Sequence, residues 1–323
     1  MKCAHPKIAL GLLCILGAAL PETHAQTGKW PEKPVRLIVA SPPGSGDDFT
    51  ARLITPKFSE LLGQQFVVDN RTGAGGLIGQ MAVLKSPPDG YTFLLAGGSM
   101  AGARYANLQA TYNVLRDFTP VSLVETAAFI MVIHPSVPAK DLKEYIALAR
   151  SQPGRMTYGS LGAGQIPYWS AILFNHMARI RAVEVAYKAI GETMNDVMAG
   201  RIDYFFAPFA IVTGNRAKLR AIGVTSATRS PAFPDVPAIG ESVPGYELPA
   251  WRSIMGPAGV RKDIVAALNN AIARTLAMPD IRERFHSVGS ETAPTTPEEL
   301  AKRYADWIER FGKMAKLAGL KPQ

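Results

Sequence analysis

Residues 42–48, with the sequence PPGSGDD, could bind an anion. They join an apolar segment at residues 35–40 to an amphipathic segment at residues 49–62, which is the pattern of a strand followed by a helix. Gly44 and Gly46 let the backbone turn sharply at the carboxyl end of the strand, and they leave N–H groups free at the positive end of the helix. We therefore expect a carboxylate or a phosphate to bind at this turn.

A serine after another apolar segment could instead be a nucleophile. The run Gly97-Gly98-Ser99 resembles the G-x-S-x-G turn that exposes a catalytic serine, but the closing glycine is missing. The histidines after residue 25 have no metal-ligand spacing. We expect no catalytic residue, no metal and no cofactor, and a ligand contact for the Ser99 hydroxyl. An exported serine hydrolase that uses Ser99 remains the alternative function.

A second glycine-rich run, residues 73–79, nearly forms a dinucleotide-binding motif. Ile78 occupies the position of its last glycine, so we interpret this run as a structural turn.

The first 25 residues predict export to the periplasm. Lys2 and Lys7 precede an apolar stretch over residues 8–20, and residues 23–25 fit a cleavage site. We therefore expect the mature chain to start near Gln26. Both cysteines lie in the predicted leader, and the mature chain would therefore contain no disulfide. No later stretch approaches the roughly 20 apolar residues that span a bilayer.

The net charge of +9 would attract small anions over long distances. The Lys and Arg residues are dispersed, and no basic run carries interleaved aromatic residues. This pattern argues against a nucleic-acid partner.

Strand and helix patterns alternate along the chain, which predicts an α/β fold with parallel sheets. The expected strands are residues 35–40, 66–69, 92–96, 121–124, 130–133, 156–158, 183–186, 202–206 and 219–224. The expected helices are residues 51–62, 77–86, 140–150, 168–179, 192–199, 263–277, 280–288 and 297–317. A Pro-dense stretch at residues 230–249 predicts a crossover between two lobes, and we expect a second crossover near residues 116–126.

Several ordered blocks of this sequence resemble the Bug or TctC-like family, the periplasmic solute receptors of tripartite tricarboxylate transporters. The blocks are residues 30–52, the NRTGAGG run at 70–76, the SPPDGYT run at 86–92, Tyr187-Lys188, and the TSATRSPAFPDVP run at 225–237. The resemblance implies a type II periplasmic-binding-protein-like fold, in which each lobe is a mostly parallel sheet flanked by helices. Lobe 1 would comprise residues 26–125 and 226–323, and lobe 2 residues 126–225.

The resemblance also implies that the lobes close on a small organic carboxylate without chemistry. The protein would be a monomer, with a membrane permease or a sensor kinase as its partner. Residues 160–165 would form the second jaw of the site. The expected ligand-binding residues are Ser41, Pro43, Gly44, Ser45, Gly46, Asp48, Ser99, Ser160, Gly162, Gly164, Gln165, Tyr187 and Ala207.

Some of these residues depart from the family pattern or have two interpretations. Gln165 stands where family members have a small hydroxyl residue. Ala207 replaces an aspartate that receptors for amines can offer, which favours a ligand without an amine. Asp48 could contact the ligand, although its charge favours a bracing role in the loop. We expect Asp47 to be solvated.

Overall fold

The computed structural model describes residue 1 and residues 30–106, 110–163 and 165–320. The chain divides into residues 1–30 and a compact unit, residues 31–323, which contains both β-sheets. The predicted leader and its cleavage site lie outside the described residues. No helix among the described residues is long and apolar enough to cross a membrane.

One sheet has six strands in the order β11-β4-β10-β3-β1-β2. These strands are β1 (Val35–Val39), β2 (Phe66–Asn70), β3 (Thr92–Gly97), β4 (Phe118–Ala127), β10 (Ala250–Pro257) and β11 (Ser290–Thr292). β1 pairs in parallel with β2 and β3, whereas β10 pairs antiparallel with β3 and β4. β1 and β3 are buried over most of their length, with Arg36 exposed on β1, as expected for strands inside a covered sheet.

The second sheet has five strands in the order β7-β6-β8-β5-β9. These strands are β5 (Phe129–Ile133), β6 (Thr157–Ser160), β7 (Val183–Ala186), β8 (Tyr204–Pro208) and β9 (Arg220–Val224). β6 pairs in parallel with β7 and β8, and β5 pairs antiparallel with β8 and β9.

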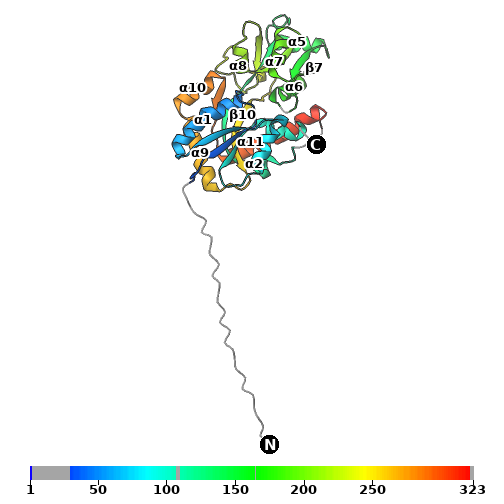
Figure 1. The fold of residues 1–323 in the computed structure, drawn as a ribbon. Helices are drawn as coiled ribbons and strands as arrows, with labels where there is room; N and C mark the ends of the chain where they lie inside the picture. The colour runs from blue at the N-terminus through cyan, green and yellow to red at the C-terminus, as the bar shows by residue number, and fades with distance from the viewer. Residues whose placement is uncertain (2–29, 107–109, 164, 321–323) are drawn as a thin grey trace. The chain divides into compact units, whose positions relative to one another are not determined.

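The longer helices divide between the two sheets (Figure 1). With the six-stranded sheet lie α1 (Gly46–Leu62), α2 (Leu77–Leu84), α9 (Lys262–Leu276), α10 (Pro279–Ser287) and α11 (Pro297–Leu317). With the five-stranded sheet lie α5 (Leu142–Ser151), α6 (Ile166–Met177), α7 (Ile190–Met198) and α8 (Phe209–Thr213). Short helices α3 (Ala103–Ala106) and α4 (Val114–Asp117) and the 3₁₀ turns η1 (Ala74–Gly76), η2 (Gly98–Gly102) and η3 (Ile239–Glu241) complete the described elements.

The predicted α/β class and the predicted strands and helices are confirmed, but both sheets are mixed rather than mostly parallel. β10 and β11 were not predicted. β4 carries the chain out of the six-stranded sheet and β10 carries it back, so the two strands run in opposite directions. The predicted division into lobes at residues 125/126 and 225/226 stays a prediction.

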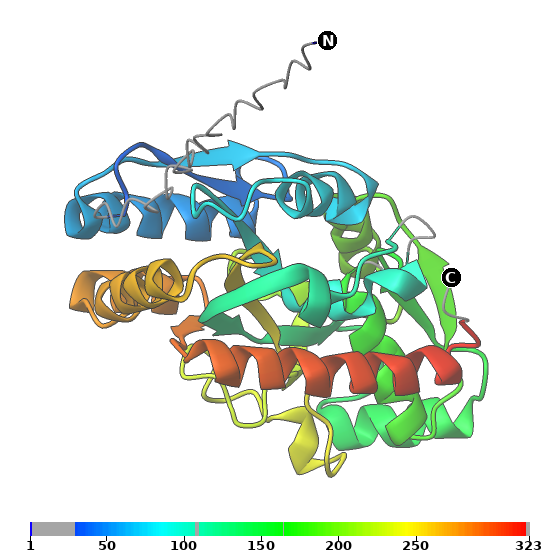
Figure 2. The ribbon, with the colours of Figure 1, turned by 90° about the horizontal axis from the view of Figure 1, so that it is seen from below.

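Aromatic packing connects the two groups of elements. The ring of Trp169 on α6 lies 5.0 Å from that of Phe311 on α11, and the row continues through Trp307 to Trp251 on β10. Helix α11 therefore runs from the six-stranded sheet to α6 of the other group (Figure 2). Its start has the predicted capping box, because Thr296 Oγ1 accepts from the Glu299 N–H at 3.2 Å and Glu299 Oε2 accepts from the Thr296 N–H at 2.9 Å.

Candidate functional site

A cavity of about 340 Å³ lies where residues of both sheets meet. Its lining includes Ser41 and Asp47 after β1, Thr72, Gly73, Gly75 and Gly76 before α2, Gly98 and Ser99 after β3, Phe129, Gln165 and Ile166 from the five-stranded sheet and α6, and Trp251 and Arg252 on β10. A neighbouring cavity of about 260 Å³ shares Gly75, Gln80, Ser99 and Gln165 with it. The two cavities therefore form one site of a size suited to a small metabolite.

Several N–H groups of the loop before α1 donate hydrogen bonds to acceptors within the same segment. The Gly44 N–H donates to Asp48 Oδ2 at 3.0 Å, the Ser45 N–H to the Pro42 carbonyl at 3.2 Å, and the Asp48 N–H to Ser45 Oγ at 3.3 Å. Ser45 is thus the N-cap of α1, and Asp48 braces the loop. Arg52 Nε donates to Asp48 at 2.9 Å. The N–H groups of Gly44, Ser45 and Asp48, which we expected to be free for an anion, therefore have partners within the loop.

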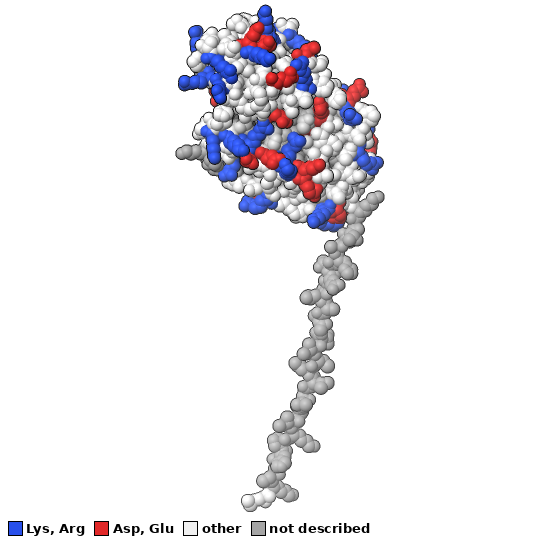
Figure 3. Space-filling view, turned by 180° about the vertical axis from the view of Figure 1, so that it is seen from behind, with Lys and Arg blue, Asp and Glu red and all other residues white. Residues whose placement is uncertain are grey.

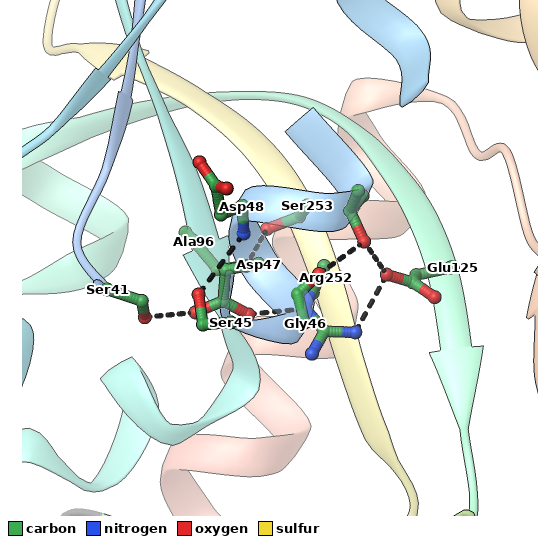
Figure 4. A network of polar contacts seen from close by, with 10 residues as sticks. Ser41, Ser45, Gly46, Asp47, Asp48, Ala96, Glu125, Arg252 and Ser253 are labelled. Carbon is green, nitrogen blue, oxygen red and sulfur yellow. Dashed lines mark hydrogen bonds and ion pairs between the residues drawn. The ribbon is translucent and has the colours of Figure 1, made fainter. Parts of the chain in front are cut away.

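Asp47 faces the cavity, and its predicted solvated role is wrong. It accepts hydrogen bonds from Ser41 Oγ and from Arg252 Nε (Figure 4). Burial would raise the pKa of Asp47, but the charge of Arg252 and the hydrogen bonds from Ser41 and Arg252 bring it below its ordinary value. Asp47 is therefore a carboxylate at neutral pH.

Arg252 connects the cavity wall to a second, deeper carboxylate. Its Nη1 donates to Glu125 Oε1 at 2.7 Å, and Glu125 also accepts from the hydroxyl of Thr50 on α1. Glu125 is 1% exposed, and it lies directly opposite Arg252 in the β4–β10 pairing. A Cβ on Gly46 would lie 2.7 Å from Arg252 Nη2, so the absence of a side chain there makes room for the guanidinium. Burial opposes the charge of Arg252, but the two carboxylates raise its pKa above the usual value.

Two other helices begin at the cavity without carboxylates of their own. α2 starts after Gly76 and α6 after Gln165, and neither has a side-chain cap or an acidic residue in its first turn. α1, by contrast, carries Asp47 and Asp48 in its first turn. The positive ends of α2 and α6 are therefore better placed than α1 to favour a ligand anion.

The structure brings some of the predicted site residues together and separates others. Ser41, Ser99 and Gln165 line the larger cavity, and Gly162 lines the smaller one. Ser160 and Ala207 are fully buried, and the Tyr187 hydroxyl donates to Asp196 at 2.7 Å. Pro43, Gly44, Ser45, Gly46 and Asp48 belong to the loop before α1 but are not among the lining residues. Gly164 lies outside the described residues.

Sequence reasoning missed Arg252, and it interpreted residues 73–79 only as a turn. Arg252 belongs to the unpredicted strand β10, and its pairing with Asp47 across 205 positions gives no local pattern. The run of glycines before α2 was a usable signal, because it resembles the glycine-rich turn before α1. Trp251, the neighbour of Arg252 on β10, is 1% exposed and also lines the cavity.

The described part of the chain shows neither a histidine at the cavities nor a cluster of metal ligands. None of its histidines is among the residues that line either cavity. No set of three or more His, Cys, Asp or Glu residues in the described ranges could hold a metal ion. On the face shown in Figure 3, acidic residues are interspersed among Lys and Arg, as the dispersed basic residues of the sequence predict.

Comparisons with known proteins agree on one family. Residues 50–320 match the model described as the tripartite tricarboxylate transporter family receptor. A protein encoded in the tcbD-tcbE intergenic region of Pseudomonas sp. (strain P51) is 34% identical over 312 residues, which cover 93% of this chain and 92% of that protein. Protein BugT of Bordetella pertussis (strain Tohama I) is 31% identical over 297 residues, covering 90% of this chain and 91% of BugT.

A solved structure extends this similarity to the fold. The structure of R. palustris Rpa4515 with adipate has a TM-score of 0.80 and 31% identity to this chain, and it covers 91% of this chain and 100% of that one.

Proposed function

Because this chain belongs to the TctC family of periplasmic solute-binding receptors, we propose that it captures a small organic carboxylate in the cavity between its sheets and delivers it to a tripartite transporter. The family consists of binding proteins rather than enzymes, so the hydrolase alternative based on Ser99 is set aside. The observation that carries the proposal is the cavity itself, whose lining offers hydroxyl groups, glycine backbone and two helix starts without carboxylates.

The acid group of the ligand would lie between the starts of α2 and α6. Each helix start favours an anion by about 0.3–1 kcal/mol, and the hydroxyl of Ser99 could donate one hydrogen bond to the ligand. Phe129, Ile166 and Trp251 would pack against the carbon chain. Binding to both sheets would favour a closed conformation by the difference in affinity between the two states. We further propose that the chain is exported, cut near Gln26 and monomeric, and that a permease or a sensor kinase receives the closed form.

The proposal is tested by thermal unfolding and calorimetry with mono-, di- and tricarboxylates and aromatic acids. At a concentration of about 100 times the dissociation constant, a cognate acid should add about 2.7 kcal/mol to the free energy of unfolding and should be recovered unchanged. The matched control is the methyl ester of each acid, which should bind at least about tenfold more weakly if the acid group is recognised. Equal binding of acid and ester, or no binding by any acid in the panel, would contradict the proposal.

A further inference from the structure

Asp47 is a carboxylate that still has acceptor capacity toward the cavity. Its side chain is 29% exposed and lines the cavity. Oδ2 accepts from Ser41 and Oδ1 accepts from Arg252. A carboxylate oxygen has two lone pairs, so each oxygen can accept one more hydrogen bond. A donor on a ligand could therefore bind to Asp47.

The charges around Asp47 disfavour an additional anion. The group contains two carboxylates, Asp47 and Glu125, and one guanidinium, that of Arg252. The other described residues that line the larger cavity have no formal charge. A ligand carboxylate at this end would bring a third negative charge to a single positive one, in a partly buried place where salt screens charges weakly.

Resting on the proposed function, we propose that Asp47 selects organic acids that carry a hydrogen-bond donor, a hydroxyl or an ammonium, at the end away from the acid group. A second carboxylate at that end is rejected. The Ala207 argument favoured a ligand without an amine, but the Ala207 side chain is fully buried. Asp47, in the first turn of α1, supplies the carboxylate that Ala207 on β8 cannot supply.

Calorimetry with matched acids tests this inference on the wild-type protein. The probes are hexanoate, 6-hydroxyhexanoate, 6-aminohexanoate and adipate, and the same four end groups on the chains of four and five carbons. We expect a hydroxyl-ended or amino-ended acid to bind at least about tenfold more tightly than the dicarboxylate of its length. Tighter binding of the amino acids alone would identify an ammonium site, and tighter binding of both would identify a general donor site. Either result supports the inference.

Asp47→Asn should abolish this preference, because it removes the charge and keeps the size of the side chain. The matched control is Asp69→Asn, since Asp69 is 30% exposed, pairs with Arg71 and lines neither cavity. The ratio of the affinity for a donor-ended acid to the affinity for the dicarboxylate of the same length should fall by about tenfold in Asp47→Asn. It should stay unchanged in Asp69→Asn.

A wild-type preference for the dicarboxylate, or the same ratio in Asp47→Asn and wild type, would overturn the inference and leave the proposed function standing. If no acid binds, the proposed function falls and the inference falls with it. The wild-type comparison decides the question even if Asp47→Asn does not fold.

Discussion

Asp48 stabilises the loop before α1 only while it is ionised. The hydrogen bond from Arg52 is the main cause that lowers the pKa of Asp48 to about 2, and the hydrogen bond from the Gly44 N–H adds to it. Burial acts in the opposite direction. In the unfolded chain the Asp48 carboxyl has a pKa of about 3.9, so it takes up a proton at a higher pH than in the folded protein. The stabilisation is therefore present above about pH 4 and is lost as the pH falls toward 2. Asp48→Asn should lower the free energy of unfolding by about 1–3 kcal/mol at pH 7.

Urea unfolding at a series of pH values measures this effect. The difference between Asp48→Asn and wild type should shrink below pH 4 and approach zero near pH 2. A difference that stays constant over this range would contradict the assigned role of the ion pair.

We expect the closeness of Gly46 to Arg252 to reverse the usual effect of glycine in a helix. Replacing a helical glycine by alanine normally gains about 1 kcal/mol. At position 46 the new Cβ would lie 2.7 Å from Arg252 Nη2, so we expect Gly46→Ala to displace the guanidinium and lower the free energy of unfolding. Gly191→Ala in α7 is the matched control, because no atom lies within 4 Å of its Cβ position. In thermal unfolding, Gly46→Ala should lower the stability of the protein and Gly191→Ala should raise it. A gain in stability in both variants would refute the close contact.

At the scale of elements, Arg252 connects β10 with β4 and α1, because its single positive charge pairs with the two carboxylates of Glu125 and Asp47. Arg252→Met would leave two partly or fully buried carboxylates unpaired, so we expect a loss of about 3–5 kcal/mol in the free energy of unfolding. Glu125→Gln would leave the balanced pair of Arg252 and Asp47, and we expect a loss of only about 1 kcal/mol. Chemical denaturation compares them. Equal losses would show that the two-to-one balance of charges does not govern stability.

Helix α6 offers a test in which stability and affinity change in opposite directions. Gln165→Glu places a negative charge at the positive helix end and should raise the free energy of unfolding by about 0.3–1 kcal/mol. The same charge faces the cavity and should weaken binding of a carboxylate by about tenfold. Ala189→Asp at the uncapped start of α7 is the control, because Ala189 lines neither cavity. It should stabilise the protein without changing affinity. Unchanged affinity in Gln165→Glu would place the acid group elsewhere.

The alternation of apolar segments and helix patterns was enough to predict most elements of this fold. The helix at residues 297–317 agrees with α11 at both ends, because its capping box and its apolar spacing are local signals. β10 was missed because its first residues follow a Pro-dense stretch and its pairing partners lie more than a hundred positions away. The charges of the cavity could not be predicted for the same reason: Asp47, Glu125 and Arg252 become neighbours only through the sheet.

For the whole molecule, the cavity and the packing beside it depend on both sheets. The row of rings from Trp169 to Trp251 connects α6, which begins at the cavity, with β10, which also lines it. A ligand that contacts Gln165 and Ser99 would add a second connection between these groups of elements. Recognition and closure would then be one event, in which the ligand completes the contact between the sheets.

A crystal structure of the protein with a cognate acid tests the central claim most directly. We predict that the acid occupies the cavity, with its carboxylate near Gln165 and Gly75 at the starts of α6 and α2 and its carbon chain against Trp251. An acid that binds with the same affinity in solution but lies outside this cavity in the crystal would contradict the account.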